Sequence, residues 1–258
     1  MSPTEKLAPG APPAADFIPL IVPEIRGNEW EYVKECLDTN WVSSVGTYVD
    51  RFEKLTAEFV GAKYAVATVN GTASLHIALM LAGVEANDEV LVSTLTFIAP
   101  ANAIRYVGAW PVFIDAEPNY WQMDPAKVIG CLENDCRWDG HVLVNKKTGR
   151  RVKAILPVHI LGHPVDLDPI LEVAAKFSLP VIEDATEGLG ARYRGRSLGS
   201  FGQFQNGLCR ERFFMPQSEP FVVSPLVALI WEIGFSSIPN EKQITEHCDG
   251  TSLLSLSQ

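Results

Sequence analysis

Between residues 17 and 202, continuous apolar runs alternate with stretches of helical periodicity. The apolar runs predict buried strands, at 64–69, 89–93, 111–116, 154–160 and 180–185. A helical pattern fills each interval between these strands, at 72–83, 99–108, 124–133 and 166–177. Because the strands are apolar throughout and do not alternate with polar residues, we expect both of their faces to be covered. This order is typical of an α/β domain with a mostly parallel sheet.

Two more helices and one hairpin complete the expected domain. Residues 27–40 and 47–61 carry apolar side chains at helical spacing, and Gly61 marks the end of the second helix. Residues 141–152 predict a β-hairpin that turns at 147–149 and is inserted between a helix opening on Asp124 and the next strand. We find no internal repeat.

The chain changes character at its two ends. Residues 1–16 are rich in Pro and Ala and lack an apolar core, so we expect a disordered arm and not a signal peptide. Residues 203–258 show no β/α alternation, and their apolar residues are clumped. We therefore divide the chain into an arm at 1–16, a domain at 17–202 and an unrelated tail at 203–258. An abrupt and complete loss of pattern is what a reading-frame change produces.

Charge and cysteine content exclude several classes of protein. The formal net charge is −10 and no basic run occurs, which argues against binding nucleic acid or an anionic membrane by charge. The longest apolar run, 221–231, contains Ser224 and Pro225 and is shorter than the roughly 20 residues of a membrane helix. The five cysteines are widely spaced and include no CxxC pair. This usage indicates a reducing compartment, expected to be the cytoplasm, and neither a disulfide framework nor a zinc site.

A candidate phosphate site lies between the first strand and the helix that follows it. In Asn70-Gly71-Thr72, glycine permits close approach of a ligand, and the helix N-terminus presents free N–H groups and a positive dipole end. The alternative is an ordinary Asn-Gly turn with Thr72 as the helix N-cap. The chain contains neither GxxxxGK[ST] nor a complete GxGxxG motif.

Other candidates lie at the carboxyl ends of predicted strands, where ligands bind in open α/β sheets. Asp184 can hold a cation or a protonated ring nitrogen, or it can cap the following loop. Phe97 can stack on a planar cofactor or belong to the core. His159 and His163 have no cysteine or carboxylate at ligand spacing, so we expect structural roles and no metal site.

Taken in order, these segments resemble the DegT/DnrJ/EryC1/StrS family, which comprises pyridoxal-phosphate-dependent aminotransferases of nucleotide-linked 4-keto sugars. The resemblance spans residues 17–202 and is carried by VNGTASLHIAL, STLTFIAPANAI, ILPVHILGHPVDLDPI and VIEDATEGLGARYRGRSLGSFG. It implies a three-layer, mostly parallel sheet of the aspartate-aminotransferase type (fold type I), here an incomplete large domain without the small domain. The inserted hairpin and the Asp-Ala-Thr-Glu sequence look most like a legionaminic-acid-type amino-sugar branch.

The resemblance assigns six residues to a pyridoxal 5′-phosphate site, namely Gly71, Thr72, Ala73, Phe97, Asp184 and Glu187. The first three would cradle the phosphate at a helix N-terminus. Phe97 would stack on the pyridine ring, and Asp184 would pair with the protonated ring nitrogen. Glu187 stands where many members carry Gln, and it would hydrogen-bond the ring hydroxyl.

The chain departs from the family after Gly202. The family continues there with a strand that bears a phosphate-binding Ser and the Schiff-base Lys, whereas this chain continues QFQNGLCRERFF. Lys242 lies in the tail but in an unrelated context, so no catalytic residue is assigned. We expect a product truncated after about residue 202, inactive as written. Without the family's next strands, we expect two buried sheet edges to be unpaired and the chain to be poorly stable and prone to aggregate. The tail segments FVV and LVALIW could in principle fill these places as strands, but nothing in the sequence selects their register.

Three functional hypotheses follow. The first is a sugar aminotransferase by descent, which uses a nucleotide-linked keto sugar and an amino-acid amino donor and whose intact relatives form homodimers. The second is a lysine-independent dehydratase that uses pyridoxal or pyridoxamine phosphate, with a His in place of the lysine. In the tail His247 is the only candidate for that His. The third is a non-catalytic fragment or pseudoenzyme.

Overall fold

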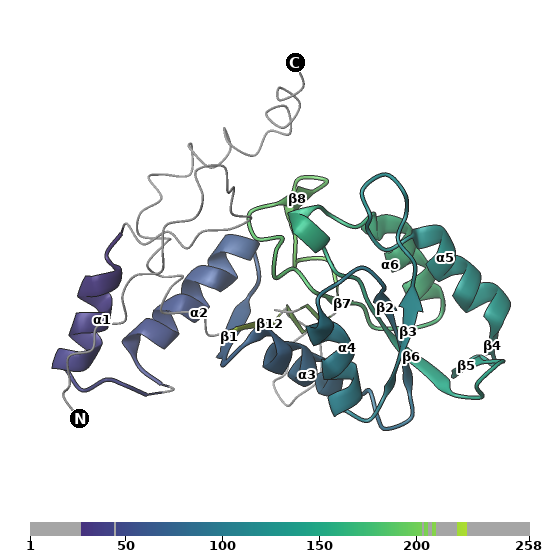
Figure 1. The fold of residues 1–258 in the computed structure, drawn as a ribbon, viewed down its shortest axis with the longest axis horizontal. Helices are drawn as coiled ribbons and strands as arrows, with labels where there is room; N and C mark the ends of the chain where they lie inside the picture. The colour runs from purple at the N-terminus through teal and green to yellow at the C-terminus, as the bar shows by residue number, and fades with distance from the viewer. Residues whose placement is uncertain (1–26, 44, 203, 206–207, 210–220, 226–258) are drawn as a thin grey trace, which may run out of the picture.

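The computed structural model describes residues 27–43, 45–202, 204–205, 208–209 and 221–225 (Figure 1). The predicted arm at 1–16 lies outside these residues, as does most of the tail. In the described part of the chain, no helix has the length and apolarity to cross a membrane.

Helices and strands alternate along the chain as the apolar pattern predicts. The helices are α1 (Glu29–Asp38), α2 (Thr47–Val60), α3 (Gly71–Leu81), α4 (Ile98–Tyr106), α5 (Pro125–Gly130) with a π-helical turn (Cys131–Asp135), a 3-10 turn (Ile160–Gly162) and α6 (Leu167–Lys176). The strands are β1 (Tyr64–Thr68), β2 (Glu89–Ser93), β3 (Trp110–Ile114), β4 (Cys136–Trp138), β5 (Leu143–Asn145), β6 (Arg151–Leu156), β7 (Ile182–Glu183), β8 (Arg192–Tyr193), β9 (Arg196–Ser197), β10 (Phe204–Gln205), β11 (Leu208–Cys209) and β12 (Phe221–Pro225).

The strands that carry the fold are parallel and follow the order β3-β2-β6-β7-β10-β12-β1. β2 pairs in parallel with β3 on one side and β6 on the other. The parallel bridges Ile155–Val181 and Val158–Asp184 join β6 to β7. β10 then pairs in parallel with both β7 and β12, and β12 pairs with β1. The predicted mostly parallel α/β sheet is confirmed.

The predicted hairpin is also confirmed. β5 pairs antiparallel with the start of β6, Leu143 opposite Val152, and β4 extends the hairpin by pairing antiparallel with β5. Gly149, in the turn, has a φ of +71°, a conformation that favours glycine. The same edge of β6 thus pairs with β5 along its first half, and along its second half it faces β7 through the Ile155–Val181 bridge.

The expectation of two unpaired sheet edges is wrong. All five residues of β1 pair in parallel with β12, from the tail, and β7 pairs with β10. Ladder hydrogen bonds join backbone groups, so an extended segment can supply them whatever its sequence, and β12 begins with the strand-favouring residues Phe-Val-Val. The expected aggregation is not tested by this pairing and stays a prediction. β1 itself is only partly buried, unlike the fully buried β2.

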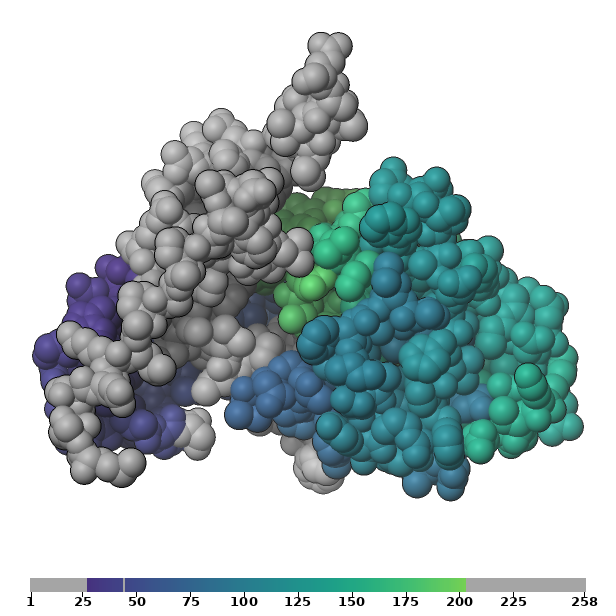
Figure 2. Space-filling model, viewed as in Figure 1, coloured from purple at the N-terminus to yellow at the C-terminus, as the bar shows by residue number. Residues whose placement is uncertain are grey.

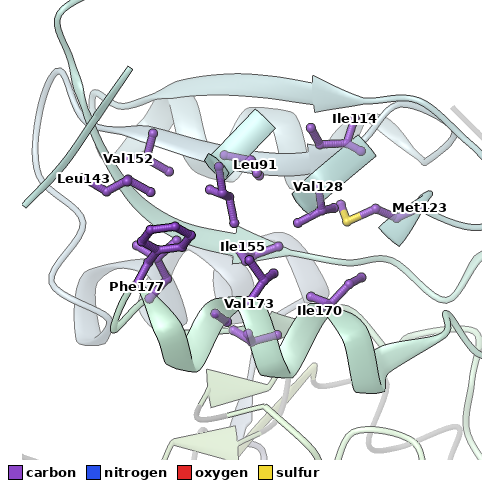
Figure 3. Close-up of a cluster of buried hydrophobic side chains, with 14 of the residues drawn as sticks. Leu91, Ile114, Met123, Val128, Leu143, Val152, Ile155, Ile170, Val173 and Phe177 are labelled. Carbon is purple, nitrogen blue, oxygen red and sulfur yellow. The ribbon is translucent and has the colours of Figure 1, made fainter. Parts of the chain in front are cut away.

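Helices cover both faces of the sheet. On one face, Leu91 and Ile155 pack against Ile170, Val173 and Phe177 at α6, together with α5 (Figure 3). On the other face, α3 and α4 pack on side chains that alternate with these along β2 and β6, namely Val90, Val92, Ala154 and Leu156. Figure 1 shows α3 and α4 on one side of β2, β3 and β6 and α5 and α6 on the other, and Figure 2 shows the same view in space-filling form. The sheet and the helices on its two faces form three layers, and one cluster lies at each of the two boundaries between them. Because both faces of β2 are covered, this strand is apolar at successive positions.

Polar side chains and glycine set several helix ends. Asp124 Oδ1 accepts a hydrogen bond from the Ala126 N–H at 2.9 Å and begins α5, as expected. Gly61, with a φ of +76°, ends α2. α1 forms as predicted but buries none of its residues, and its Trp30 is 71% exposed.

Candidate functional site

A cavity of about 250 Å³ lies at the carboxyl ends of the parallel strands. Four separate segments line it: the start of α3, the turn after β2, the turn after β6 and the turn after β7. Five of the six predicted cofactor residues meet there, namely Gly71, Thr72, Phe97, Asp184 and Glu187. The parallel topology brings them together because it places all these strand ends on one edge.

The sixth predicted residue, Ala73, does not line the cavity. Its N–H donates to Asn70 Oδ1 at 2.9 Å, which makes Asn70 the N-cap of α3. The alternative in which Thr72 caps this helix is therefore wrong. Gly71 and Thr72 contribute the first N–H groups of α3 beside the cavity, where the helix dipole is positive.

The α3 end is also fixed to the sheet. Thr68, the last residue of β1, and Ser74 share a buried hydrogen bond of 2.6 Å between their hydroxyl oxygens. The Ser74 N–H donates to the carbonyl oxygen of Asn70 at 3.1 Å. These contacts hold the Asn70-Gly71-Thr72 turn rigidly between strand and helix, as an anion site at a helix N-terminus requires.

Asp184 lines the cavity and also accepts hydrogen bonds from the turn that follows it. Its side chain lines the cavity with only 6% of the residue exposed, and its Oδ1 accepts from the Thr186 hydroxyl at 2.6 Å and the Thr186 N–H at 3.2 Å. It therefore caps the following turn. Its backbone accepts from the His159 N–H at 3.0 Å and donates to the Pro157 carbonyl oxygen at 2.9 Å, which fixes it against the turn after β6.

Phe97 is not a core residue, because 77% of it is exposed. It precedes α4 directly and lines the cavity with an aromatic ring that the protein does not bury. The neighbouring Thr96 hydroxyl oxygen is buried, and no hydrogen-bond partner for it exists in the part of the chain that the structure describes. A buried hydroxyl without a partner is uncommon and marks a place where a ligand can complete the hydrogen bonding.

Glu187 bridges two of the cavity-lining turns. Its Oε2 accepts from the Leu161 N–H at 2.5 Å, and its carbonyl oxygen would lie 2.8 Å from a Cβ added at Gly162. Leu161 and Gly162 both have positive φ, at 56° and 74°. The turn after β6 is therefore packed tightly against the turn after Asp184.

The two histidines hold structural positions, as expected. His159 is fully buried, accepts from the Val165 N–H at Nδ1 over 3.1 Å, and lies 3.3 Å from the Glu183 carboxylate at Nε2. His163 stacks on Tyr120 with ring centroids 4.4 Å apart. Among the described residues, no group of His, Cys, Asp and Glu could hold a metal ion.

Sequence reasoning missed Glu183. It is fully buried, and its carboxylate accepts hydrogen bonds from the backbone of the turn that precedes β10. The available signal was a glutamate within a continuous apolar run, because a carboxylate is almost never fully buried unless it is paired.

The sequence and the fold both match known proteins. The chain is 45% identical over 185 residues to a GDP-perosamine synthase of Caulobacter vibrioides and 41% identical over 186 residues to that of Escherichia coli O157:H7. Each match covers 72% of this chain and 46% or 47% of the relative. The chain therefore spans about half the length of the curated relatives it matches.

Solved aminotransferases share the fold. An aminotransferase from Psychrobacter cryohalolentis superposes with a TM-score of 0.62 at 30% identity, over 82% of this chain and 50% of that one. A Bacillus subtilis protein with bound pyridoxamine phosphate superposes with a TM-score of 0.59 at 25% identity, over 80% of this chain and 43% of that one. The predicted large-domain fold of the aspartate-aminotransferase type is confirmed. Because the family's sequence profile matches residues 23–206, this chain belongs to the DegT/DnrJ/EryC1/StrS aminotransferase family.

Proposed function

We propose that the cavity binds pyridoxal 5′-phosphate or its amine form, and that the chain derives from aminotransferases of nucleotide-linked 4-keto sugars. We further propose that the chain as written does not catalyse transamination alone. The observation that carries the binding proposal is the convergence of Gly71, Thr72, Phe97, Asp184 and Glu187 on one cavity from separate segments of the chain.

The residues present fit such a cofactor in chemistry. Gly71 and Thr72 at the start of α3 suit a phosphate dianion, because helix N-termini favour negative charge. The largely exposed Phe97 ring suits the flat face of a pyridine. The Asp184 carboxylate suits a protonated ring nitrogen, and the unpartnered Thr96 hydroxyl indicates room for a further polar group.

Each of these residues has a distinct task. The first turn of α3 binds the phosphate and sets its position. Phe97 orients the ring and excludes water from one face. Asp184 holds a proton at the ring nitrogen, and Glu187 hydrogen-bonds the ring hydroxyl while it accepts from the Leu161 N–H. When bound, the cofactor supplies a cationic ring that acts as an electron sink.

What is missing is a group that moves the substrate proton. None of the residues that line the cavity in the described part of the chain is a lysine. Transamination needs a nucleophile and base beside the reacting carbon, so the described residues of the cavity bind and orient without performing that step. The lysine would come from a restored reading frame or a second polypeptide.

The substrate class rests on the relatives. Two of them are GDP-perosamine synthases. For an intact counterpart of this chain we propose a nucleotide-linked keto sugar as acceptor, an amino acid as donor and a homodimer as the working form. The legionaminic-acid-type branch, the cytoplasmic location and the reading-frame origin of the tail stay predictions.

Titration of the purified chain with pyridoxamine 5′-phosphate, followed by cofactor fluorescence, tests the binding proposal. We expect saturable binding that Asp184→Asn weakens. A second sample, incubated with pyridoxal 5′-phosphate and reduced with borohydride, is digested and examined by mass spectrometry. We expect that no single lysine is modified stoichiometrically. Absence of saturable binding would refute the cofactor site, and stoichiometric modification of one lysine would refute the proposed inactivity.

A further inference from the structure

The buried carboxylate of Glu183 is the centre of a hydrogen-bond cluster beside the cavity. Glu183 directly precedes Asp184 but does not line the cavity, and 0% of it is exposed. Its Oε1 accepts from the Phe201 N–H at 2.7 Å and from the Gly202 N–H. Its Oε2 accepts from the Gly199 N–H at 3.0 Å and lies 3.3 Å from His159 Nε2.

The contact with His159 is also a donated hydrogen bond. His159 Nδ1 accepts from the Val165 N–H at 3.1 Å, so this nitrogen carries no proton and the ring proton is on Nε2. Both carboxylate oxygens of Glu183 therefore face two N–H donors each. A buried carboxylate is tolerated only when it is satisfied in this way.

The cluster joins two segments that line the cavity to a third that does not. One is the turn after β6, whose His159 lines the cavity. The second is the end of β7, where the Asp184 carbonyl accepts from the His159 N–H at 3.0 Å. The third is the turn through Gly199 and Phe201 that leads into β10. Loss of the Glu183 carboxylate would remove the side-chain bonds that tie β7 to the His159 ring and to the turn before β10, and would leave only backbone bonds between β7 and the turn after β6.

We propose that Glu183 is a positioning residue, which holds Asp184 and the His159 turn in the geometry that binds the cofactor ring. This inference rests on the proposed function. Shape alone does not require a carboxylate at this place, since an apolar residue of similar size would fill the same volume, but it would leave the surrounding N–H groups without an acceptor. What the carboxylate adds is a fixed connection between the Asp184 backbone and the turn before β10.

Glu183→Gln tests the inference with little change in shape. The glutamine amide replaces one acceptor oxygen by an NH₂ group, and in either orientation that group faces two N–H donors. Glu133→Gln is the matched control, because it removes a carboxylate from a surface ion pair with Lys176. We expect Glu183→Gln to weaken pyridoxamine phosphate binding about tenfold or more, equivalent to about 1.4 kcal/mol, and the control to leave it unchanged.

A double-mutant cycle separates positioning from a general loss of stability. If Glu183 acts through Asp184, Glu183→Gln has much less effect on binding in an Asp184→Asn background than in the wild type. An equal loss in both backgrounds, or no loss in the wild type, overturns the inference. Hydrogen exchange gives an independent readout, with faster exchange expected in the peptide that contains Gly199 and Phe201. Unchanged exchange there also overturns it.

The two proposals fail in different ways. If the wild-type chain does not bind pyridoxamine phosphate, the proposed function fails, and the positioning role fails with it. If the wild type binds and Glu183→Gln binds equally well, only the positioning role fails.

Discussion

Gly162 offers a direct test of how tightly the cavity turns are packed. Its φ is +74°, in the left-handed region, and a Cβ built there would lie 2.8 Å from the Glu187 carbonyl oxygen. The left-handed conformation costs a residue with a Cβ roughly 1–2 kcal/mol. The contact is shorter than real Cβ contacts allow, so a backbone group must move, and such overpacking costs about 1–3 kcal/mol.

Gly149→Ala separates these two contributions. Gly149 has a φ of +71°, nearly the same as Gly162, but a Cβ there would meet nothing within 4 Å. Both substitutions also reduce the entropy of the unfolded chain, worth about 0.4–1 kcal/mol in favour of folding. We therefore expect a net loss of about 1 kcal/mol for Gly149→Ala and of about 2–4 kcal/mol for Gly162→Ala.

Urea unfolding followed by circular dichroism measures the difference. Provided that the slopes of the unfolding free energy against urea agree, the shift in midpoint reports stability alone. We also expect Gly162→Ala to weaken pyridoxamine phosphate binding, since the displaced backbone carries Glu187, and Gly149→Ala to leave it unchanged. Equal midpoints for the two variants would refute the reasoning, because the contact with Glu187 is the difference between them.

Three further predictions concern caps, pH and thiols. Asn70→Ala should lower the free energy of unfolding by about 0.5–2 kcal/mol through loss of the α3 cap, and a urea midpoint equal to the wild type would contradict this. The backbone N–H of Val142, with a second N–H from the same turn, holds the pKa of Asp139 below its usual value. A group whose pKa is lower in the folded state stabilises the fold at pH values above its unfolded pKa of about 3.9, and this stabilisation is lost as the pH falls through the folded pKa. Asp139→Asn removes this contribution, so the urea midpoints at neutral and at acid pH should differ less in the variant than in the wild type. A hydrogen bond from Cys136 lowers the pKa of Cys131, whereas that bond and burial raise the pKa of Cys136. Iodoacetamide should therefore modify Cys131 before Cys136, as peptide mass spectrometry would show.

Local pattern was sufficient for the main elements of the fold and for most of the site. β2 and β6 are apolar at successive positions because both of their faces are buried, and that requirement is visible in the sequence. Gly71, Thr72, Phe97 and Asp184 were candidates because they follow predicted strands, and parallel strands end on one edge of a sheet, whereas Glu187 came only from the family resemblance. Asp184 and Phe97 could be placed at that edge before their contacts were known.

Choices that depend on distant parts of the chain could not be predicted. Thr72 and Asn70 are both good N-cap residues, and the backbone path into α3 selects Asn70. Phe97 fits a core or a cavity wall equally well by composition, and only packing leaves it 77% exposed. Glu183 was not singled out from the sequence, because its role depends on the N–H groups that the turn before β10 places around it.

The tail most clearly separates what the sequence determined from what only the tertiary structure decided. By itself the sequence determined that β1 and β7 need partners, because buried backbone groups must form hydrogen bonds. The tail offered FVV and LVALIW as candidate partner segments, but its loss of pattern after Gly202 selected no register for them, so we expected the two edges to stay unpaired. The tertiary structure alone decided that β10 and β12 occupy these places, because ladder bonds join backbone groups and depend on where a segment lies more than on its side chains.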